Sequence, residues 1–471
     1  MFAMRLDGDM ALMRAAVMVS VGWHVVLSAH AVDAAEPPPN VVLIISDDQT
    51  WTDYGFMGHE EIQTPHLDVL ARQSALFTRG YVPTALCRPS LMTLVTGLYA
   101  HQHRTTGNDP SPAVTDPKTP AYDRQREKLI AHVDELDTLP TWLSKKSYRS
   151  HQSGKWWEGS YRRGGFSHGM TRGFPEPGGR HGDDGLKIGR QGLQPIFDFV
   201  DQAVEDETPF FVWYAPFLPH LPHTPPERLL KKYQRDGRHA ALAKYYAMCE
   251  WFDETCGQLV NFIDGRALAQ NTLIIYVTDN GWIQRTPETQ VPAGWRTQFA
   301  PKSKQSPNEG GTRTPIMLRW SGVIEPSQRS ELVSSIDLVP TILQAAGVAV
   351  PEHLPGVDLL SLVRDGKPLQ RERIFGESFA HDIVDTENPE ATLLYRWCIE
   401  GRWKLLLTYD GVVNRYRAVH LRTDPGPQLY DLWADPHETT NLAGDHPGQV
   451  GRLAQRIEAW WPVHQRQTKI D

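Results

Sequence analysis

The sequence contains few cysteines and no surplus of basic side chains. Only four of its 471 residues are cysteines, and two of them, Cys249 and Cys256, fall about two helical turns apart, too far for a disulfide bond. We therefore expect no disulfide framework to hold the fold together. The net charge of -8 excludes a general nucleic-acid binder, because such proteins need a basic face to displace counterions from phosphates.

Internal repeats and low-complexity tracts are absent, and long apolar runs are confined to the N-terminus. There, Arg14 precedes the run from Ala15 to Val32, and small residues follow it. This order predicts a secretory signal peptide over residues 1–35 and an exported protein, periplasmic or extracellular. Because His24 interrupts the run, we expect no stable membrane span after cleavage, and a retained N-terminal anchor is the alternative.

Three short apolar runs have the pattern of strands that are buried on both faces of a parallel sheet. They are residues 41–45, 210–214 and 273–277. Amphipathic stretches, among them 196–204 and 240–263, lie between these runs. The alternation predicts an α/β fold in which helices sandwich a large mixed, mostly parallel sheet.

The pattern of apolar and polar residues changes after about Leu369. Short alternating segments follow at 402–407 and 428–432, and a final helix is expected from about Gln449. We therefore predict a main domain over 36–369. A smaller C-terminal α+β subdomain over 370–471 would hold a small antiparallel sheet and the terminal helix.

Acidic and amide side chains follow two of the predicted strands. Asp47 and Asp48 come after the first run, and Asp279 and Asn280 after the last. Ligands of open α/β sheets bind beyond the carboxyl ends of strands, and an all-oxygen donor set favours calcium or magnesium. Either pair alone is explained as well by a helix cap or an Asx turn, whereas the two together predict a metal site.

A short helix is predicted to begin at Cys87. Pro89 suits a first helical turn, Leu91 and Leu94 recur with helical spacing, and Gly97 can end the helix. The exposed amides at such an N-terminus favour an anion, which would be a thiolate or an oxyanion of bound sulfate or phosphate. A small buried residue is the plainer interpretation of Cys87 taken alone.

The segment Cys87-Arg88-Pro89-Ser90, followed by Leu94-Val95-Thr96-Gly97, is similar to the sulfatase signature C-x-P-S-R-x-x-x-L-T-G. Further segments match the same family in the same order, from about Asn40 to about Leu442, and such a series is more specific than any single motif. They are Ser46-Asp47-Asp48, 64–68, Gly154-Lys155-Trp156, Pro219-His220-Leu221-Pro222, 278–281, 309–315, 429–432 and Asp435-Pro436. The chain thus resembles a formylglycine-dependent sulfatase of the alkaline phosphatase superfamily.

This resemblance implies a sulfuric ester hydrolase whose catalytic domain is the main domain. Cys87 would be oxidised to formylglycine by a formylglycine-generating or an anaerobic sulfatase-maturating enzyme. One hydroxyl of the hydrated aldehyde would attack sulfur, and the other would later expel the sulfate. One calcium ion per chain would be bound by Asp47, Asp48, residue 87, Asp279 and Asn280. The expected substrate is a sulfated small molecule or glycan, with carbohydrate sulfates the expected class for an exported enzyme.

The resemblance also assigns roles to three basic side chains. Lys155 matches the lysine of the family's G-K-W-H motif, and Lys304 matches its second sulfate-binding lysine. Both would neutralise charge that builds on the transferring group and the leaving oxygen. His220 matches the histidine of the P-H-x-P segment and would donate a proton or a hydrogen bond to the leaving alcohol.

Two positions depart from the family pattern. Leu91 stands in place of the signature's arginine, and Trp157 replaces the histidine of G-K-W-H, so the base that would help expel sulfate is missing. Arg88 is not expected to replace the arginine, because its side chain leaves the opposite side of a tight turn. The candidates for the missing base are His101, His103, His151 and His168.

Two other functions stay open. A phosphatase or phosphonate-ester hydrolase of the same superfamily would use calcium and two lysines equally well, although Cys87 argues against it. A non-catalytic binder of sulfated glycans would fit the departures at Leu91 and Trp157, but it would not need the complete metal and lysine sets. Further candidate contacts to a sugar are Trp51, Asp53, Asn108, Trp156, Trp157, Arg162, Arg163, Trp282 and Trp295.

Overall fold

The computed structural model describes residues 38–282, 302–409 and 426–464, which belong to one structural unit that begins at Pro38. The predicted signal peptide and Trp295 lie outside these residues. Within the described ranges, no helix is both long and apolar enough to cross a membrane.

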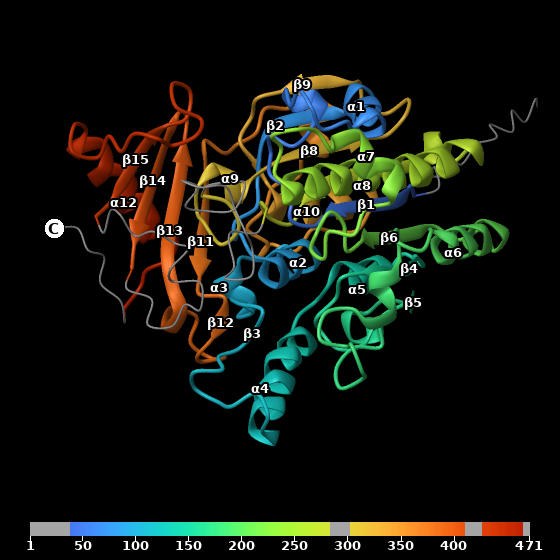
Figure 1. Cartoon of the computed structure of the whole chain (residues 1–471), viewed down its shortest axis with the longest axis horizontal. Coiled ribbons are helices and arrows are strands. Elements are labelled where there is room, and N and C mark those ends of the chain that lie inside the picture. Colours follow the sequence, from blue (N-terminus) through green and yellow to red (C-terminus); the bar gives the residue numbers. More distant parts are fainter. Residues whose placement is uncertain (1–37, 283–301, 410–425, 465–471) are drawn as a thin grey trace, which may run out of the picture. The chain divides into compact units, whose positions relative to one another are not determined.

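A nine-stranded sheet forms the centre of the fold (Figure 1), in the order β10-β2-β8-β7-β1-β6-β4-β5 with β9 beside β2. Its strands are β1 (Asn40–Ser46), β2 (Ala75–Tyr81), β4 (Arg149–Gly154), β5 (His168–Gly169), β6 (Phe210–Ala215), β7 (Thr272–Thr278), β8 (Arg313–Arg319), β9 (Ser327–Arg329) and β10 (Val333–Ser334). Neighbours pair in parallel except β8, which is antiparallel to β2 and β7. The predicted mixed, mostly parallel sheet is confirmed, and the three predicted strands are β1, β6 and β7.

Helices cover both faces of this sheet because its central strands are buried on both sides. In β1, Leu43 contributes to one core together with Leu94 of α2, and Ile44 contributes to the opposite core together with Phe252 of α8. This explains why the strand reads as an uninterrupted apolar run rather than as an alternating one. The helices are α1 (Pro65–Arg72), α2 (Cys87–Thr96), α3 (Ala100–His103), α4 (Pro120–Ile130), α5 (Leu139–Ser144), α6 (Gln194–Glu205), α7 (Glu227–Tyr233), α8 (Ala240–Gly265), α9 (Glu309–Thr312), α10 (Leu338–Ala345), α11 (Leu360–Val363) and α12 (Pro447–Trp460).

A second, antiparallel sheet follows in the chain and confirms the predicted smaller α+β region (Figure 1). It has the order β11-β13-β14-β15, and α12 packs against it through Leu453 and Ile457. Its strands are β11 (Arg373–Phe379), β13 (Leu393–Glu400), β14 (Trp403–Thr408) and β15 (Gln428–Asp431), and a separate two-stranded pair joins β3 (Asp109–Pro110) to β12 (Asp382–Ile383). The domain boundary at 369/370 falls shortly before β11 and stays a prediction.

Candidate active site

The predicted acidic pairs meet at the carboxyl ends of two adjacent strands. Strands β1 and β7 run parallel with Ser46 opposite Thr278, so the residues that follow both strands emerge side by side. The amide of Asp48, whose φ is 64°, donates to Asp279 Oδ1 over 3.1 Å. The amide nitrogen of Asn280 donates to Asp48 Oδ1 over 2.9 Å. Parallel pairing of β1 and β7 therefore brings the two acidic pairs together, as the strand ends predicted.

Each of these four side chains keeps one buried oxygen that accepts no hydrogen bond within the described part of the chain. The four atoms are Asp47 Oδ2, Asp48 Oδ2, Asp279 Oδ2 and Asn280 Oδ1. Buried polar atoms without a partner are rare and need an explanation, and a hard cation with oxygen ligands provides one. Burial raises the pKa of Asp47 well above its usual value and also raises that of Asp279; the neighbouring carboxylates add to the effect, and Lys155 opposes it. This donor set therefore fits calcium.

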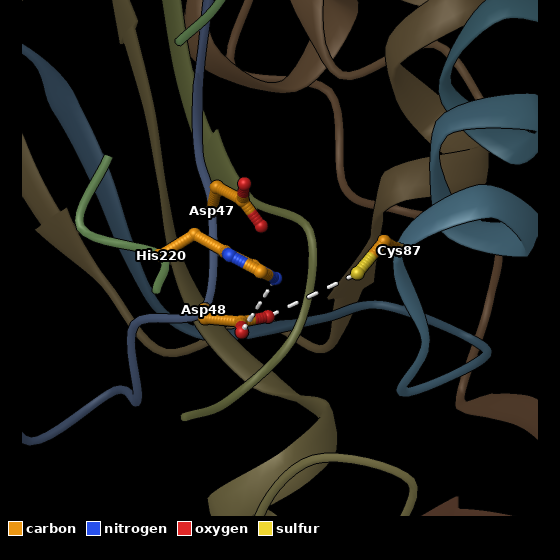
Figure 2. Close-up of side chains that lie close together, drawn as sticks. All are labelled: Asp47, Asp48, Cys87 and His220. Carbon is orange, nitrogen blue, oxygen red and sulfur yellow. Dashed lines mark hydrogen bonds and ion pairs between the residues drawn. The ribbon is translucent and has the colours of Figure 1, made fainter. Parts of the chain in front are cut away.

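Cys87 is the first residue of α2 and lies against the acidic group (Figure 2). Its Sγ is 3.9 Å from Asp48 Oδ1 and 3.0 Å from Lys304 Nζ, and the residue is only 1% exposed. Burial raises the pKa of the Cys87 thiol to about 11, against the opposing effects of Lys155 and Lys304. The unmodified thiol thus stays protonated at neutral pH and is a poor nucleophile.

Lys155 and Lys304 approach from two different segments and are both buried. Lys155 Nζ lies 2.6 Å from Asp47 Oδ1, and Lys304 Nζ lies 2.6 Å from Asp48 Oδ1. Burial opposes the charge on each lysine, but the carboxylates outweigh it, so the pKa of Lys155 is raised and that of Lys304 is raised well above its usual value. Both ammonium groups are therefore charged and lie beside the predicted metal ligands.

His220 completes the group from the loop after β6, which joins β1 through the bridge between Asp47 and Pro219. Its Nδ1 donates to the carbonyl oxygen of Leu221 over 2.6 Å, and its Nε2 lies 3.3 Å from Asp48 Oδ2 (Figure 2). Burial, followed by the two lysines, lowers its pKa well below the usual value. One ligand atom of each of Asp47, Asp48, Cys87 and His220 lies within 4.8 Å of every other, so His220 is closer to the metal ligands than its motif suggested.

The structure also places the two departures from the family pattern. Leu91 packs into the core between the sheet and its covering helices. Arg88 forms a buried, two-pronged ion pair with Glu158, at 2.7 and 2.6 Å, so its guanidinium is already engaged. The ring of Trp157 lies 5.1 Å from Lys155 Nζ, in cation–π contact.

The four histidines proposed as a replacement base contact residues outside the acidic group. His101 pairs with Glu377 at 2.6 Å, and His103 lies 3.3 Å from the Thr93 hydroxyl. His151 and His168 both pack against Phe199 of α6. The expectation that one of them supplies the missing base therefore gains no support from their contacts.

His181, which is not among the predicted site residues, lies near enough to Lys155 and Lys304 to interact with their charges. Its ring centroid is 5.4 Å from that of Trp157 and 5.5 Å from that of Phe217. No sequence pattern singles it out, because it lies in the glycine-rich segment 178–182 outside every matched motif. The only signal is the pair of glycines that flank Arg180-His181, which mark a loop.

Several candidate sugar contacts have partners within the protein. Asp53 accepts hydrogen bonds from Thr50 and Tyr245, and burial raises its pKa to about 7. Asn108 accepts from the amide of Arg88. The aromatic and arginine candidates contact other protein side chains, namely Trp51 with His437 and Arg313, Trp156 with Phe166 and Trp213, Trp282 with Tyr245, Arg162 with Tyr161, and Arg163 with Glu127 and Asp134. Packing explains these side chains without a ligand.

Comparison with known proteins agrees with this geometry. The family model described as Sulfatase matches residues 39–348, and the one described as N-sulphoglucosamine sulphohydrolase, C-terminal, matches residues 303–459. The chain is 28% identical to human arylsulfatase A over 90% of this chain and 87% of that protein. It is 24% identical to an N-acetylgalactosamine-6-O-sulfatase of Bacteroides thetaiotaomicron, over 89% of this chain and 93% of that protein.

The fold is that of solved sulfatases as well. A structure from the glycosaminoglycan metabolism of Bacteroides thetaiotaomicron superposes with a TM-score of 0.69 at 21% identity, covering 90% of this chain and 99% of that one. Fold and site together define a hydrolase of the alkaline phosphatase superfamily. Within it, the chain belongs to the sulfatase family and is an enzyme that hydrolyses sulfate esters.

Proposed function

We propose that this enzyme is an exported, calcium-dependent sulfatase that acts on a sulfated carbohydrate through a formylglycine formed from Cys87. The observation that carries the proposal is the set of four buried oxygens that accept no hydrogen bond from the described residues, beside Cys87 and two charged lysines. The substrate class is supported by the relatives named for N-acetylgalactosamine 6-sulfate. The signal-peptide pattern at residues 1–35 supports export.

The residues around position 87 have different roles in the reaction. A formylglycine there supplies the hydroxyl that attacks sulfur. Asp47, Asp48, Asp279 and Asn280 would hold calcium through their free oxygens, and the bound cation would draw sulfate oxygens into the site. Lys155 and Lys304 place two positive charges where negative charge grows in the transition state.

His220 would serve the leaving alcohol. Its Nδ1 is fixed by the carbonyl of Leu221, which orients the ring and leaves Nε2 turned into the site. The ring is stacked on Phe217 with centroids 4.4 Å apart, so it is held in one orientation. A held imidazole that exchanges a proton with the leaving oxygen is a usual device for ester cleavage.

Peptide mass spectrometry across residue 87, on protein from its native host, tests the proposal. We expect formylglycine in the active enzyme, formed by a formylglycine-generating or an anaerobic sulfatase-maturating enzyme. Active protein that carries only the unmodified thiol would refute the mechanism.

A substitution series tests the reaction itself. Cys87→Ala should abolish hydrolysis of sulfate esters, whereas Cys249→Ala, which changes another buried cysteine, should leave it intact. Phosphate and phosphonate esters are assayed in parallel. Faster turnover of these esters than of every sulfate ester would favour the alternative phosphohydrolase.

A further inference from the structure

Two aromatic rings, those of Trp157 and Phe217, lie beside Lys155, and His181 contacts both of them. Lys155 Nζ lies 5.1 Å from the ring of Trp157 and 5.3 Å from the ring of Phe217. His181 contacts both rings, and His220 stacks on Phe217. Two imidazoles therefore flank one aromatic ring beside the ammonium group of Lys155.

The loop that carries His181 is tied to both halves of the site. On one side, the carbonyl of His181 accepts from the amide of Trp156, next to Lys155, over 3.3 Å. On the other side, Arg180 pairs with Asp109, with Nε 2.9 Å from Oδ2, and Asp109 follows Asn108, which holds the amide of Arg88 beside Cys87. His181 is thus held between the Lys155 loop and the start of α2.

The Nδ1 atom of His181 is buried and is not used in a hydrogen bond among the described residues. Burial, followed by the nearby charges of Lys155 and Arg180, lowers its pKa to about 3, with Asp109 opposing and Lys304 adding to the effect. A neutral imidazole has one ring nitrogen with a lone pair, and that nitrogen can accept a proton.

We propose that His181 is the general base of this site and takes the place that Trp157 leaves without an imidazole. The inference rests on the proposed function. His181 accepts through Nδ1 the proton of the hydroxyl on modified residue 87. The O–H electron pair then forms the carbonyl while the carbon–oxygen bond to sulfate breaks, and sulfate leaves with the electron pair of that bond. His220 acts on the alcohol, so the two imidazoles serve different proton transfers.

The first test compares His181→Gln with His168→Gln, which alters the exposed histidine at the start of β5. We expect kcat to fall about 100-fold or more in His181→Gln, with KM changed less than about threefold because no substrate-binding charge is removed. His168→Gln should match the wild type. Added imidazole should restore part of the rate of His181→Ala. A kcat of His181→Gln within about twofold of the wild type would overturn the inference.

The second test needs neither turnover nor a modified residue. In the Cys87→Ser protein, titration with inorganic sulfate is followed by ¹³C NMR of histidine rings, with His181→Gln and His168→Gln identifying the two signals. Sulfate should shift the His181 signal and leave the His168 signal in place. An unshifted His181 signal in protein that binds sulfate would refute the assignment.

The two tests also separate this inference from the function on which it rests. Wild-type enzyme without sulfatase activity or without a modified residue 87 would defeat the proposed function. Active, modified wild-type enzyme with an equally active His181→Gln variant would defeat only the role of His181.

Discussion

At the scale of single residues, the sequence predicts those residues of the site that lie in a recognisable local motif. Asp47, Asp48, Asp279 and Asn280 follow strands whose apolar runs are visible in the sequence, and parallel pairing brings them together. His181 could not be predicted in this way, because its place beside Trp157 depends on a loop with no regular pattern. Side chains that enter a site through tertiary contacts leave no trace in spacing.

The unpartnered oxygens of the acidic group lead to a prediction about calcium. Adding calcium to chelated protein should raise the melting temperature by about 2–5 °C, since a ligand that binds only the folded state stabilises it. Asp279→Asn should lose most of this shift, because it removes one charge from the donor set. Differential scanning calorimetry with and without chelator measures the effect.

Asp264→Asn is the matched control, because Asp264 pairs with Arg319 and not with the acidic group. Its calcium-dependent shift should equal that of the wild type. If calcium moved the melting temperature of Asp279→Asn as much as that of the wild type, the acidic group would not be the binding site.

At the scale of elements, hydrophobic patterns identified β1, β6 and β7 but gave no sign of β4. That strand reads Arg149-Ser-His-Gln-Ser-Gly154, and all of it but the first residue is buried. Two of its polar side chains bond within the sheet, since Gln152 donates to the carbonyl of Gly154 and Ser153 donates to the carbonyl of Trp213. A buried strand made of polar residues escapes any search for apolar runs.

Gly154 ends β4 and sets the position of Lys155. Its φ is 87°, and a Cβ there would lie 1.8 Å from the carbonyl oxygen of Ala215. Gly154→Ala should therefore displace Lys155, lower kcat/KM at least about 100-fold and reduce the melting temperature, because both strain and a backbone clash are introduced. Enzyme assays and thermal unfolding measure the two effects.

Gly58→Ala provides the comparison for this prediction. Gly58 has a φ of 99° with open space around the added Cβ, so strain alone should cost about 1 kcal/mol. Its kcat/KM should stay at the wild-type value. A Gly154→Ala enzyme as active as Gly58→Ala would show that the position of Lys155 does not depend on this glycine.

At the scale of the whole molecule, the second sheet is joined to the segment that carries Lys304. Lys404 of β14 is fully buried, and its Nζ lies 3.0 Å from Glu309 and 3.2 Å from Glu438. Glu309 begins α9, five residues after Lys304, and its amide donates to Glu438 over 2.6 Å. The change of sequence pattern after Leu369 indicated a second region. The ion pairs that join this region to the Lys304 segment could not be predicted from the sequence.

Lys404→Met tests the junction. Removing the ammonium takes away the cation that two buried carboxylates share, which should destabilise the protein by about 3–5 kcal/mol. Catalysis should also weaken, since α9 and Lys304 share one segment. Urea unfolding and kcat provide the measurements. Lys231→Met, which changes a lysine paired with Glu227 on the surface, should cost at most about 1 kcal/mol, and equal losses in the two variants would contradict the prediction.

Buried neutral histidines make the stability of the molecule depend on pH. Burial lowers the pKa of His151 to about 4, so below pH about 6.5 the unfolded state takes up a proton that the folded state refuses. This contribution is lost as the pH falls from about 6.5 towards 4. Asp53 and Asp253 have pKa values raised to about 7. Their contribution to stability is therefore lost as the pH rises through 7.

Comparison of the wild type with His151→Gln isolates the histidine. Between pH 7.5 and pH 5, the wild type should lose about 2 kcal/mol more unfolding free energy than the variant, which cannot titrate at this position. Urea denaturation at the two pH values measures the difference. Parallel pH dependences of the two proteins would show that His151 does not contribute.

The near-complete enclosure of Cys87 has a consequence for the order of events in the cell. With 1% of the residue exposed, a maturating enzyme has no access to the side chain once α2 has packed on the sheet. Under the proposed function, conversion must precede folding, and a chain that folds first is trapped as an inactive product. The active fraction of a preparation would then be set during synthesis by a race between modification and folding, and later incubation with the maturating enzyme would not raise it.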